Sequence, residues 1–503
     1  MAAKRASKKA SRKPASGKVR SGATQHAKGK PKAAQDANLA AQLTSAYLDY
    51  GTATIEGRAL PDFRDGLTPV QRRLLWTCWE DRLTPDRAYK KAASIVGSAM
   101  GYHPHGDLSL AGALVNLAHL PLKMIDGLGN WGRPELGSTV PAAAVRYIEG
   151  KLTQDAVDCL FDRRLLAVSD MVPNYDGTKL EPLVLPAALP MPLLLGATGI
   201  AVGTTTNIPA FTAKSVAALV GMALGKEKIT PAVLAKTLKL ASPYGGKVVS
   251  TAAEQAAVWD TGRGKVEWVG QWTPDASNRT ITLHDLPPDW PYDGALNRMR
   301  AVTEVRHVKD LSSGSRIAIE IGFKPSVPKK EFDAFAEKFA KRFFGKTISY
   351  RINVTRRLKV EKDGLTETSA KFFEAGVASL INEWIEWRVA LEVKAAQKEK
   401  ADFEARMRRE QLLLRGAQNA EALVKILRSK AAPDKVAASV RKLLACSKDE
   451  ADWVMDQPLS RLSRVSEEAV AEKIKRLQAD VKAAEKIIAR PRAAVAASLP
   501  TFA

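Results

Sequence analysis

A heptad repeat near the C-terminal end constrains the fold more than any other feature of this chain. Its apolar positions keep a 4-3-4-3-4 spacing: Val470, Ile474, Leu477, Val481, Ala484 and Ile488. A second set follows a 4-3-4 spacing upstream: Leu380, Trp384, Trp387 and Leu391. Because such repeats place apolar side chains along one helix face, two long helices are predicted to pair as an antiparallel coiled coil. Residues 416–458 between them are predicted to form a small helical cap, for which dimerisation is the simplest role.

The rest of the chain mixes helical and strand patterns. From 39 to 172, short helices separated by Gly and Pro are predicted, the clearest over 67–79 and 108–120. Residues 245–360 alternate in the manner of strands, and the chain is predicted to become helical beyond Thr366. The sequence therefore predicts an α+β multidomain protein.

The charge of the chain favours a polyanionic partner. The chain holds 77 Lys and Arg against 54 Asp and Glu, a net charge of +23. Eleven of those cations precede the first acid, Asp36, so the remainder still carries +12. Residues 1–37 are predicted to be a disordered basic tail, because they offer almost nothing to bury. Two roles stay open for that tail, a solvated extension and a sequence-independent DNA tether.

Cysteine usage and hydropathy indicate a cytoplasmic protein with no membrane partner. Only Cys78, Cys159 and Cys446 occur, far apart and odd in number, which disfavours a disulfide framework or a zinc site. The sequence contains no apolar run long enough to cross a bilayer and no signal peptide at its start. We therefore expect a cytoplasmic location, associated with the nucleoid, or the host cytoplasm if the chain is encoded by a phage.

Two short segments carry the residues best suited to phosphodiester chemistry. Arg146 directly precedes Tyr147 after a run of small residues, and Tyr102-His103-Pro104-His105-Gly106-Asp107 lies upstream. A tyrosine hydroxyl is a poor nucleophile at neutral pH and needs nearby cations to stabilise the developing negative charge. An Arg-Tyr pair with two histidines and a basic surround could hold a phosphodiester and attack it.

These segments belong to a longer series of motifs. The remaining members are Arg58–Asp62, Asp65–Leu67, Pro69–Arg73, Gly129–Gly132, Asn174–Thr178 and Gly199–Gly203. In order and spacing the series resembles the DNA breakage-reunion (A) subunits of type IIA topoisomerases, the group that includes gyrase and topoisomerase IV. The resemblance is highly specific from Tyr47 to Pro209 and continues more weakly through most of the chain.

The resemblance implies a catalytic role for four residues. Tyr147 would attack the scissile phosphate and become a 5′-phosphotyrosine, and Arg146 would neutralise the transition state. Arg58 and His103 match positions near the same phosphate. The chain would thereby make a transient double-strand break and pass a second duplex through it, relaxing or decatenating DNA in an ATP-dependent reaction.

A second set of residues is expected to contact DNA without reacting. Ile200, between glycines, matches a wedge that inserts between base pairs and bends the duplex. Arg72 and Arg73 would contact phosphates, and the basic turn that holds Arg263 and Lys265 is either an ordinary hairpin or a contact to flanking DNA. The complete set is Arg72, Arg73, His105, Ile200, Arg263 and Lys265.

The resemblance also implies a division into domains. A winged-helix breakage-reunion domain is expected over 38–172 and an α/β tower domain over 173–362. A long antiparallel coiled coil with a helical C-gate dimerisation cap would occupy 363–490, followed by a tail over 491–503. Because the chain ends without a C-terminal pinwheel domain, we expect a short, phage-type or topoisomerase IV-like subunit that does not introduce negative supercoils.

The sequence offers no metal or nucleotide site of its own. It contains no Asp-x-Asp pair, and Gly345-Lys346-Thr347 lacks the first glycine of a P-loop because Ala340 stands there. No metal ligands are assigned. The resemblance implies that ATP and Mg²⁺ bind a partner subunit with an ATPase and a TOPRIM domain, in an A₂B₂-type assembly built on a homodimer of this chain on double-stranded DNA.

Several positions depart from the pattern of the resemblance. Thr68 occupies a place usually held by Lys, Leu128 replaces a Gln, and Leu108 and Gly112 replace a Ser and an acid. These changes motivate an alternative, a catalytically idle DNA-binding protein that keeps the fold. Retention of both Arg146 and Tyr147 argues against it. A tyrosine recombinase is disfavoured, because its nucleophile lies near the C-terminus.

Overall fold

A computed structural model describes residues 39–54, 58–134, 136, 140–242, 245–313, 316–362, 365–429, 432–457 and 467–502. The basic tail predicted over 1–37 lies outside these ranges. The chain divides into two units, Met1–Asp49 and Tyr50–Ala503. Helix α1, Leu39–Thr54, falls mainly in the first unit, and every other element falls in the second.

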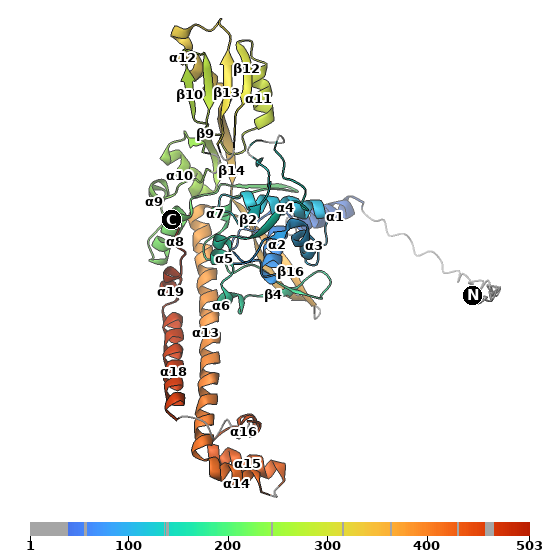
Figure 1. Cartoon of the computed structure of the whole chain (residues 1–503), viewed down its shortest axis with the longest axis vertical. Helices are drawn as coiled ribbons and strands as arrows, with labels where there is room; N and C mark the ends of the chain where they lie inside the picture. Colours follow the sequence, from blue (N-terminus) through green and yellow to red (C-terminus); the bar gives the residue numbers. More distant parts are fainter. Residues whose placement is uncertain are drawn as a thin grey trace, which may run out of the picture. The chain divides into compact units, whose positions relative to one another are not determined.

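Short helices and one small sheet form the region up to residue 166 (Figure 1). The helices are α2 (Pro69–Glu80), α3 (Ala92–Ala99), α4 (Asp107–His119), α5 (Gln154–Leu160) and α6 (Arg163–Leu166). The antiparallel sheet has the order β1-β3-β2, with β1 at Lys90–Lys91, β2 at Ile125–Leu128 and β3 at Glu149–Leu152. Helix α2 begins at Pro69, whose ring pre-sets the first helical φ. The two helices predicted over 67–79 and 108–120 are thus confirmed within two residues.

Two antiparallel sheets dominate the middle of the chain. One has the order β6-β7-β14-β9-β8: Ala197–Ala201, Thr204–Ile208, Gly345–Arg351, Arg263–Val269 and Lys247–Val248. The other has the order β10-β11-β13-β12: Trp272–Asp275, Thr280–Leu283, Ile319–Phe323 and Val305–Asp310. Helices α11 (Tyr292–Arg300) and α12 (Phe332–Phe343) pack on the second sheet and enclose a phenylalanine-rich core. The strand character predicted for 245–360 is confirmed.

The remaining elements of the middle region connect these sheets to the rest of the chain. A short hairpin pairs β4 (Met171–Pro173) with β5 (Leu180–Pro182). The helices are α7 (Pro192–Leu195), α8 (Ala213–Leu224), α9 (Pro231–Thr237) and α10 (Ala252–Thr261), with a 3₁₀ turn η3 at Lys329–Glu331.

A long hairpin joins the middle of the chain to its beginning. Strands β15 (Asn353–Lys362) and β16 (Leu365–Glu374) pair along ten residues each. Thr355 bridges to Asp62, and the Phe63 amide donates to the Thr355 carbonyl at 2.9 Å. The prediction of helix beyond Thr366 is wrong for this stretch, because pairing with β15 satisfies the backbone of β16. The expected boundary between 362 and 363 falls between the two strands of this hairpin.

Two long helices pack against each other in the C-terminal part. Helix α13 spans Val377–Gln418 and α18 spans Glu467–Ala489, side by side in Figure 1. Lys400 pairs with Glu485, and Lys473 pairs with Glu410, so the helices run antiparallel. Both helices and their antiparallel pairing are confirmed. The upstream apolar set does not form the seam, because Leu380 and Trp384 pack in the main core and Leu391 packs against Leu165.

A helical cap follows α13, as predicted. It consists of α14 (Ala420–Leu427), α15 (Pro433–Leu444) and α16 (Lys448–Met455), which share a small core with the end of α13. The expected tail over 491–503 contains helix α19 (Pro491–Ala497), whose Val495 is fully buried in the main core.

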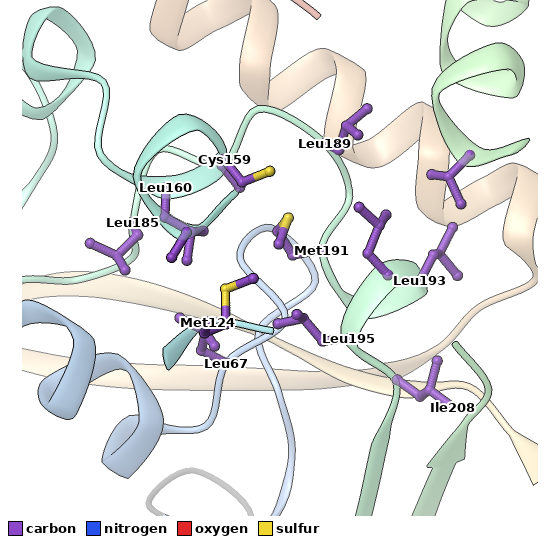
Figure 2. Packing of buried hydrophobic residues seen from close by; sticks show 14 of the residues in the cluster. Leu67, Met124, Cys159, Leu160, Leu185, Leu189, Met191, Leu193, Leu195 and Ile208 are labelled. Carbon is purple, nitrogen blue, oxygen red and sulfur yellow. The ribbon is translucent and has the colours of Figure 1, made fainter. Parts of the chain in front are cut away.

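The main hydrophobic core lies where α2–α5, the 185–195 segment and the first turns of α13 meet. Figure 2 shows its centre, where Leu67, Met124, Met191 and Leu195 converge with Cys159 above them. Gly66 adopts φ +67°, and a Cβ there would lie 2.6 Å from the Met191 backbone, so only glycine permits this approach. Within the described ranges, no helix is long and apolar enough to span a membrane.

Candidate active site

The Arg146–Tyr147 pair lies on an exposed loop that leads into β3. The Tyr147 side chain is 65% exposed, and the Arg146 guanidinium carbon lies 4.6 Å from the centre of its ring. Backbone hydrogen bonds fix the loop, because the Tyr147 amide donates to the Ala144 carbonyl at 2.8 Å and the Ala143 amide donates to Asn130 at 2.9 Å. The tyrosine hydroxyl and a cation are therefore presented together to solvent, as a reaction on a large external substrate requires.

The backbone of the Gly129–Gly132 motif packs against this loop. Gly132 adopts φ +80°, and a Cβ there would lie 2.6 Å from the Ala142 amide nitrogen. Trp131 is buried against Gly127 and Gly150 of the β2–β3 pair. The glycines of the motif thus let two backbone segments lie closer together than side chains would allow. The motif itself contributes no reacting group.

His103 is the buried member of the candidate site. It follows α3, where its amide donates to the Ala99 carbonyl, and its side chain is 6% exposed. Its ring stacks on His105 with centroids 4.1 Å apart. Burial, together with the neighbouring charges of His105, Arg73 and Arg58, lowers the pKa of His103 to about 4. The ring is therefore neutral at pH 7.

Arg73 fixes the tautomer of that ring. Its Nη1 donates to His103 Nδ1 at 3.0 Å, and because a guanidinium can only donate, Nε2 of the neutral ring carries the proton. Glu181, on β5, holds Arg73 from the other side through contacts of 2.7–3.1 Å. Arg58 Nη2 donates to His105 Nε2 at 3.4 Å. The structure thus joins four predicted residues, Arg58, His105, His103 and Arg73, into one chain of contacts.

Glu181, the partner of Arg73, is a residue of this cluster that sequence reasoning missed. It is buried, although it lies next to Pro182 in an apolar stretch that gives no hint of a charged partner. A carboxylate in such a stretch is itself the available signal, because a buried acid requires a paired cation.

The two parts of the site lie at opposite ends of α3. At its first residues, the amides of Ala92 and Ala93 donate to the carbonyls of Ile148 and Val145, which flank the Arg-Tyr pair. His103 follows its last turn. Helix α3, whose eight residues rise about 12 Å, therefore connects the tyrosine loop to the segment that carries the histidine pair.

Arg72 is placed differently from the expected phosphate contact. Its side chain is buried and donates to both carboxylate oxygens of Asp65 at 2.6 and 2.8 Å and to the Leu67 carbonyl at 3.0 Å. Its Nε and Nη2 donors are therefore committed inside the protein. Arg72 stabilises the turn that precedes α2 and is not available to DNA in this structure.

Ile200 is 81% exposed on β6, opposite Thr205 of β7. An exposed isoleucine at a hairpin is free to insert into a partner. Neighbouring Gly199 approaches the segment after Arg58, since a Cβ there would lie 2.0 Å from the Ala59 carbonyl oxygen. The candidate wedge is thereby tied to the chain segment that carries Arg58.

Arg263 and Lys265 lie on an exposed edge, but not in a turn between strands. Gly262, at φ +74°, ends α10, and the two cations are the first and third residues of β9. Both side chains are exposed and point to the same side of the sheet. The prediction of a hairpin turn is therefore corrected to a helix-to-strand turn.

The segment that resembles the end of a P-loop lies in a strand of the structure. Gly345, Lys346 and Thr347 belong to strand β14, and the Lys346 ammonium contacts the Asp289 carbonyl, which is not the loop before a helix that a P-loop requires. No cluster of three or more His, Cys, Asp or Glu able to hold a metal ion is found among them. Thr68, at the departure from the usual Lys, donates to Gln71 Oε1 through its amide and its hydroxyl at the start of α2.

Comparison with known proteins places these motifs in a family context. The family of DNA gyrase and topoisomerase IV A subunits matches residues 58–499. The chain is 29% identical to the DNA gyrase A protein of Mycobacterium tuberculosis over 90% of its length and 54% of that protein. It is 31% identical to the DNA gyrase A protein of Thermotoga maritima, over 84% of this chain and 52% of that one. The chain thus spans about half the length of the curated relatives it matches.

Proposed function

Because this chain belongs to the family of DNA gyrase and topoisomerase IV A subunits, we propose that it is the DNA-cleaving and religating component of a type IIA topoisomerase. The observation that carries the proposal is the exposed Tyr147 hydroxyl beside the Arg146 guanidinium on a fixed loop. A nucleophile buried in a pocket could not reach the backbone of a duplex, whereas this one can.

The proposed reaction exchanges one phosphodiester bond of DNA for one to tyrosine. The Tyr147 hydroxyl gives up its proton as its oxygen bonds to the phosphorus. The bond from phosphorus to the 3′ oxygen breaks, and the 3′ oxygen takes up a proton from solvent, so protons balance and a free 3′ hydroxyl is left. Arg146 stabilises the negative charge that develops on the phosphoryl oxygens. Attack by the 3′ hydroxyl reverses every step, so the covalent intermediate stores the bond and resealing requires no further energy source.

The histidine part of the site supplies a donor and a cation. Since His103 is neutral and protonated on Nε2, it can donate a hydrogen bond to a phosphate oxygen without carrying charge. Arg58 is exposed and can approach a phosphate directly. Arg73 acts through His103, because its own donors are held by Glu181 and the imidazole.

Other parts of the chain would bind and bend double-stranded DNA. Ile200 is proposed to insert between base pairs, and Arg263 and Lys265 to contact flanking phosphates. The cap formed by α14–α16 is proposed as a homodimer contact, so that two copies cut opposite strands. ATP and Mg²⁺ are proposed to bind a partner subunit in an A₂B₂-type assembly, as membership of the family implies.

Covalent capture of DNA tests the proposal. The chain is mixed with its partner subunit, Mg²⁺ and plasmid, denatured, and compared with the Tyr147→Phe variant. We expect protein-linked double-strand breaks in the wild type and none in the variant. Tyr175→Phe is the matched control, since Tyr175 is also exposed, at 58%, and should leave the breaks unchanged. Tight DNA binding without any linkage in the wild type would instead identify an idle DNA-binding protein.

A further inference from the structure

A row of side chains crosses the five-stranded sheet on the same face as Ile200. One residue from each of the strands β6, β7, β14 and β9 forms the row, in that order: Thr198, Asn207, Arg351 and Arg263. Directly opposed residues of antiparallel strands point to one face, and Ile200, two residues after Thr198, shares that face. The opposite face of β14 and β9 packs in the main core, so the row lies on the solvent side of the sheet.

Two arginines lie side by side in this row. Arg351 is the direct cross-strand partner of Arg263, and Lys265 lies two residues along β9 on the same face. Like charges directly opposite each other destabilise a sheet. Among the described residues, none of these three side chains forms an ion pair. The next residue on this face of β9 is an acid, Glu267, which leaves the cations in excess and favours a polyanionic partner.

The side chains between the wedge and the arginines are neutral and bonded within the sheet. The Thr198 hydroxyl donates to Asn207 Oδ1 at 3.3 Å, and Asn207 Nδ2 donates to the Ser349 carbonyl at 2.9 Å. Counted from β6, Arg351 is therefore the first charged side chain of the row, and it is partly exposed.

The sheet fixes the distance from Ile200 to Arg351. Their strands are two steps apart in the sheet, and adjacent strands lie about 4.7–4.9 Å apart. Ile200 also lies two residues, or about 7 Å, further along its strand than the row itself. Backbone to backbone, the two residues are therefore separated by roughly 12 Å, the rise of three to four base pairs at about 3.4 Å each.

We infer that Arg351 is a further DNA-contacting residue, which together with Arg263 binds the phosphate backbone about three to four base pairs from the step that Ile200 opens. A wedge alone opens a step, whereas a second contact on the flank holds the bent arm and repays the cost of deformation. A guanidinium suits this role because its donors match the geometry of phosphate oxygens. The inference rests on the proposed function for the nature of the partner, a bent duplex.

The salt dependence of DNA binding tests the contact. Each phosphate contact adds about 0.9 to the slope of log affinity against log salt concentration. From about 50 to 200 mM salt, the affinity of the wild-type full chain for a short duplex should thus fall roughly threefold to fourfold more than that of Arg351→Ala. Arg476→Ala is the matched control, because it removes an exposed arginine from α18 and should keep the wild-type slope. A wild-type slope in Arg351→Ala would overturn the inference.

Replacement of single phosphates by neutral methylphosphonates locates the contact. A fluorescent adenine analogue, which brightens when its base unstacks, marks the opened step, and Ile200→Ala should abolish that signal. We expect one replacement, within about five base pairs of the step, to weaken binding of the wild type but not of Arg351→Ala. Dependence on Arg351 at a more distant phosphate, or at none, would overturn the inference.

Failure of this inference can be told apart from failure of the proposed function. Arg351→Ala removes one of two opposed like charges, so its melting temperature should equal or exceed that of the wild type. Breaks that depend on Tyr147, together with a wild-type salt slope in Arg351→Ala, would reject only the contact. A reduced slope without any covalent linkage in the wild type would keep the contact and reject the cleavage reaction.

Discussion

The Arg146–Tyr147 loop and the Arg72–Asp65 pair use charged and polar side chains in opposite ways. On the loop, the tyrosine is 65% exposed and the Arg146 guanidinium lies over the ring beside it. Around Asp65, the carboxylate is fully buried and accepts from Arg72 and from the amides of Leu67 and Leu185. In the first region the polar groups are exposed to solvent. In the second they are hydrogen-bonded to one another inside the protein.

This difference separates residues that are available to react with a partner from residues that hold other parts of the protein in place. Both regions lie within motifs of the same family pattern, so motif membership alone does not assign a role. An exposed cation can be removed without harm to the fold, whereas removal of one member of a buried pair leaves the other charge without compensation. Substitutions in the two regions should therefore change different quantities.

The largest effect is expected from Asp65→Asn, on stability. The change removes the carboxylate that is paired with the buried Arg72, and we expect the free energy of unfolding to fall by about 3–5 kcal/mol. Urea denaturation of the full chain measures it. Asp158→Asn, at an exposed position on α5, should change stability by less than about 0.5 kcal/mol. Equal stability of the Asp65→Asn variant and the wild type would remove the contrast between the two regions.

Arg146→Ala should have the converse profile. Loss of a group that stabilises transition-state charge typically lowers the rate by about 10²–10³-fold, and we expect covalent-complex formation to slow by that factor. The melting temperature should not change, because the side chain is exposed. Arg263→Ala, an exposed cation on β9, serves as the control for general loss of positive charge. Slowing of the same size in both variants would show that Arg146 acts only through bulk charge.

The pH dependence of stability sharpens the role of His103. Its pKa in the folded chain is about 4, below the ordinary 6.5, so the unfolded chain takes up the proton first as pH falls. The contribution of the neutral His103 ring to the free energy of unfolding is complete above pH 6.5. It is lost as pH falls toward 4, an effect on the order of 2–3 kcal/mol. His103→Gln should lack this loss in urea denaturation at pH 7 and pH 4.5. The exposed His284→Gln should retain it, and a wild-type-like slope in His103→Gln would contradict the burial argument.

The smallest effect is expected from Ile200→Ala. Because the side chain is 81% exposed, stability should not change, but a shorter wedge should weaken DNA bending by about 1 kcal/mol, roughly fivefold. Fluorescence energy transfer between the ends of a short duplex reports the bend. Thr198→Ala, exposed two residues earlier on the same strand, should bend DNA normally. Unaltered bending in Ile200→Ala would rule out the wedge.

Local signals made much of the architecture predictable. Thr68-Pro69 marked the start of α2, and the heptad spacing marked the α13–α18 pair. The β15–β16 hairpin was missed from Thr366 onward, although its strands pair across a short local connection, with Lys362 opposite Leu365. Its first strand also bridges Asp62 through Thr355, and a contact between residues so far apart in the sequence leaves no local pattern.

The sequence located the motifs of the candidate site, but it could not assign a role to each residue within them. Arg72 and Arg73 are adjacent and identical in type, yet successive helical residues point about 100° apart, so one reaches Asp65 and the other His103. Sequence cannot choose between them until the core-facing side of α2 is known. Glu181 lies 108 residues from Arg73 and was missed for the same reason.

The bond between Asp62 and the Arg357 amide has a consequence for synthesis. The two residues are 295 positions apart, so at elongation rates of about 5–20 residues per second the second emerges roughly 15–60 s after the first. Throughout that interval Asp62 has neither the Arg357 amide nor the strand that carries it. During this interval the nascent N-terminal region cannot complete its buried hydrogen bonds. We therefore expect chaperones to bind it until the β15 strand has been synthesised.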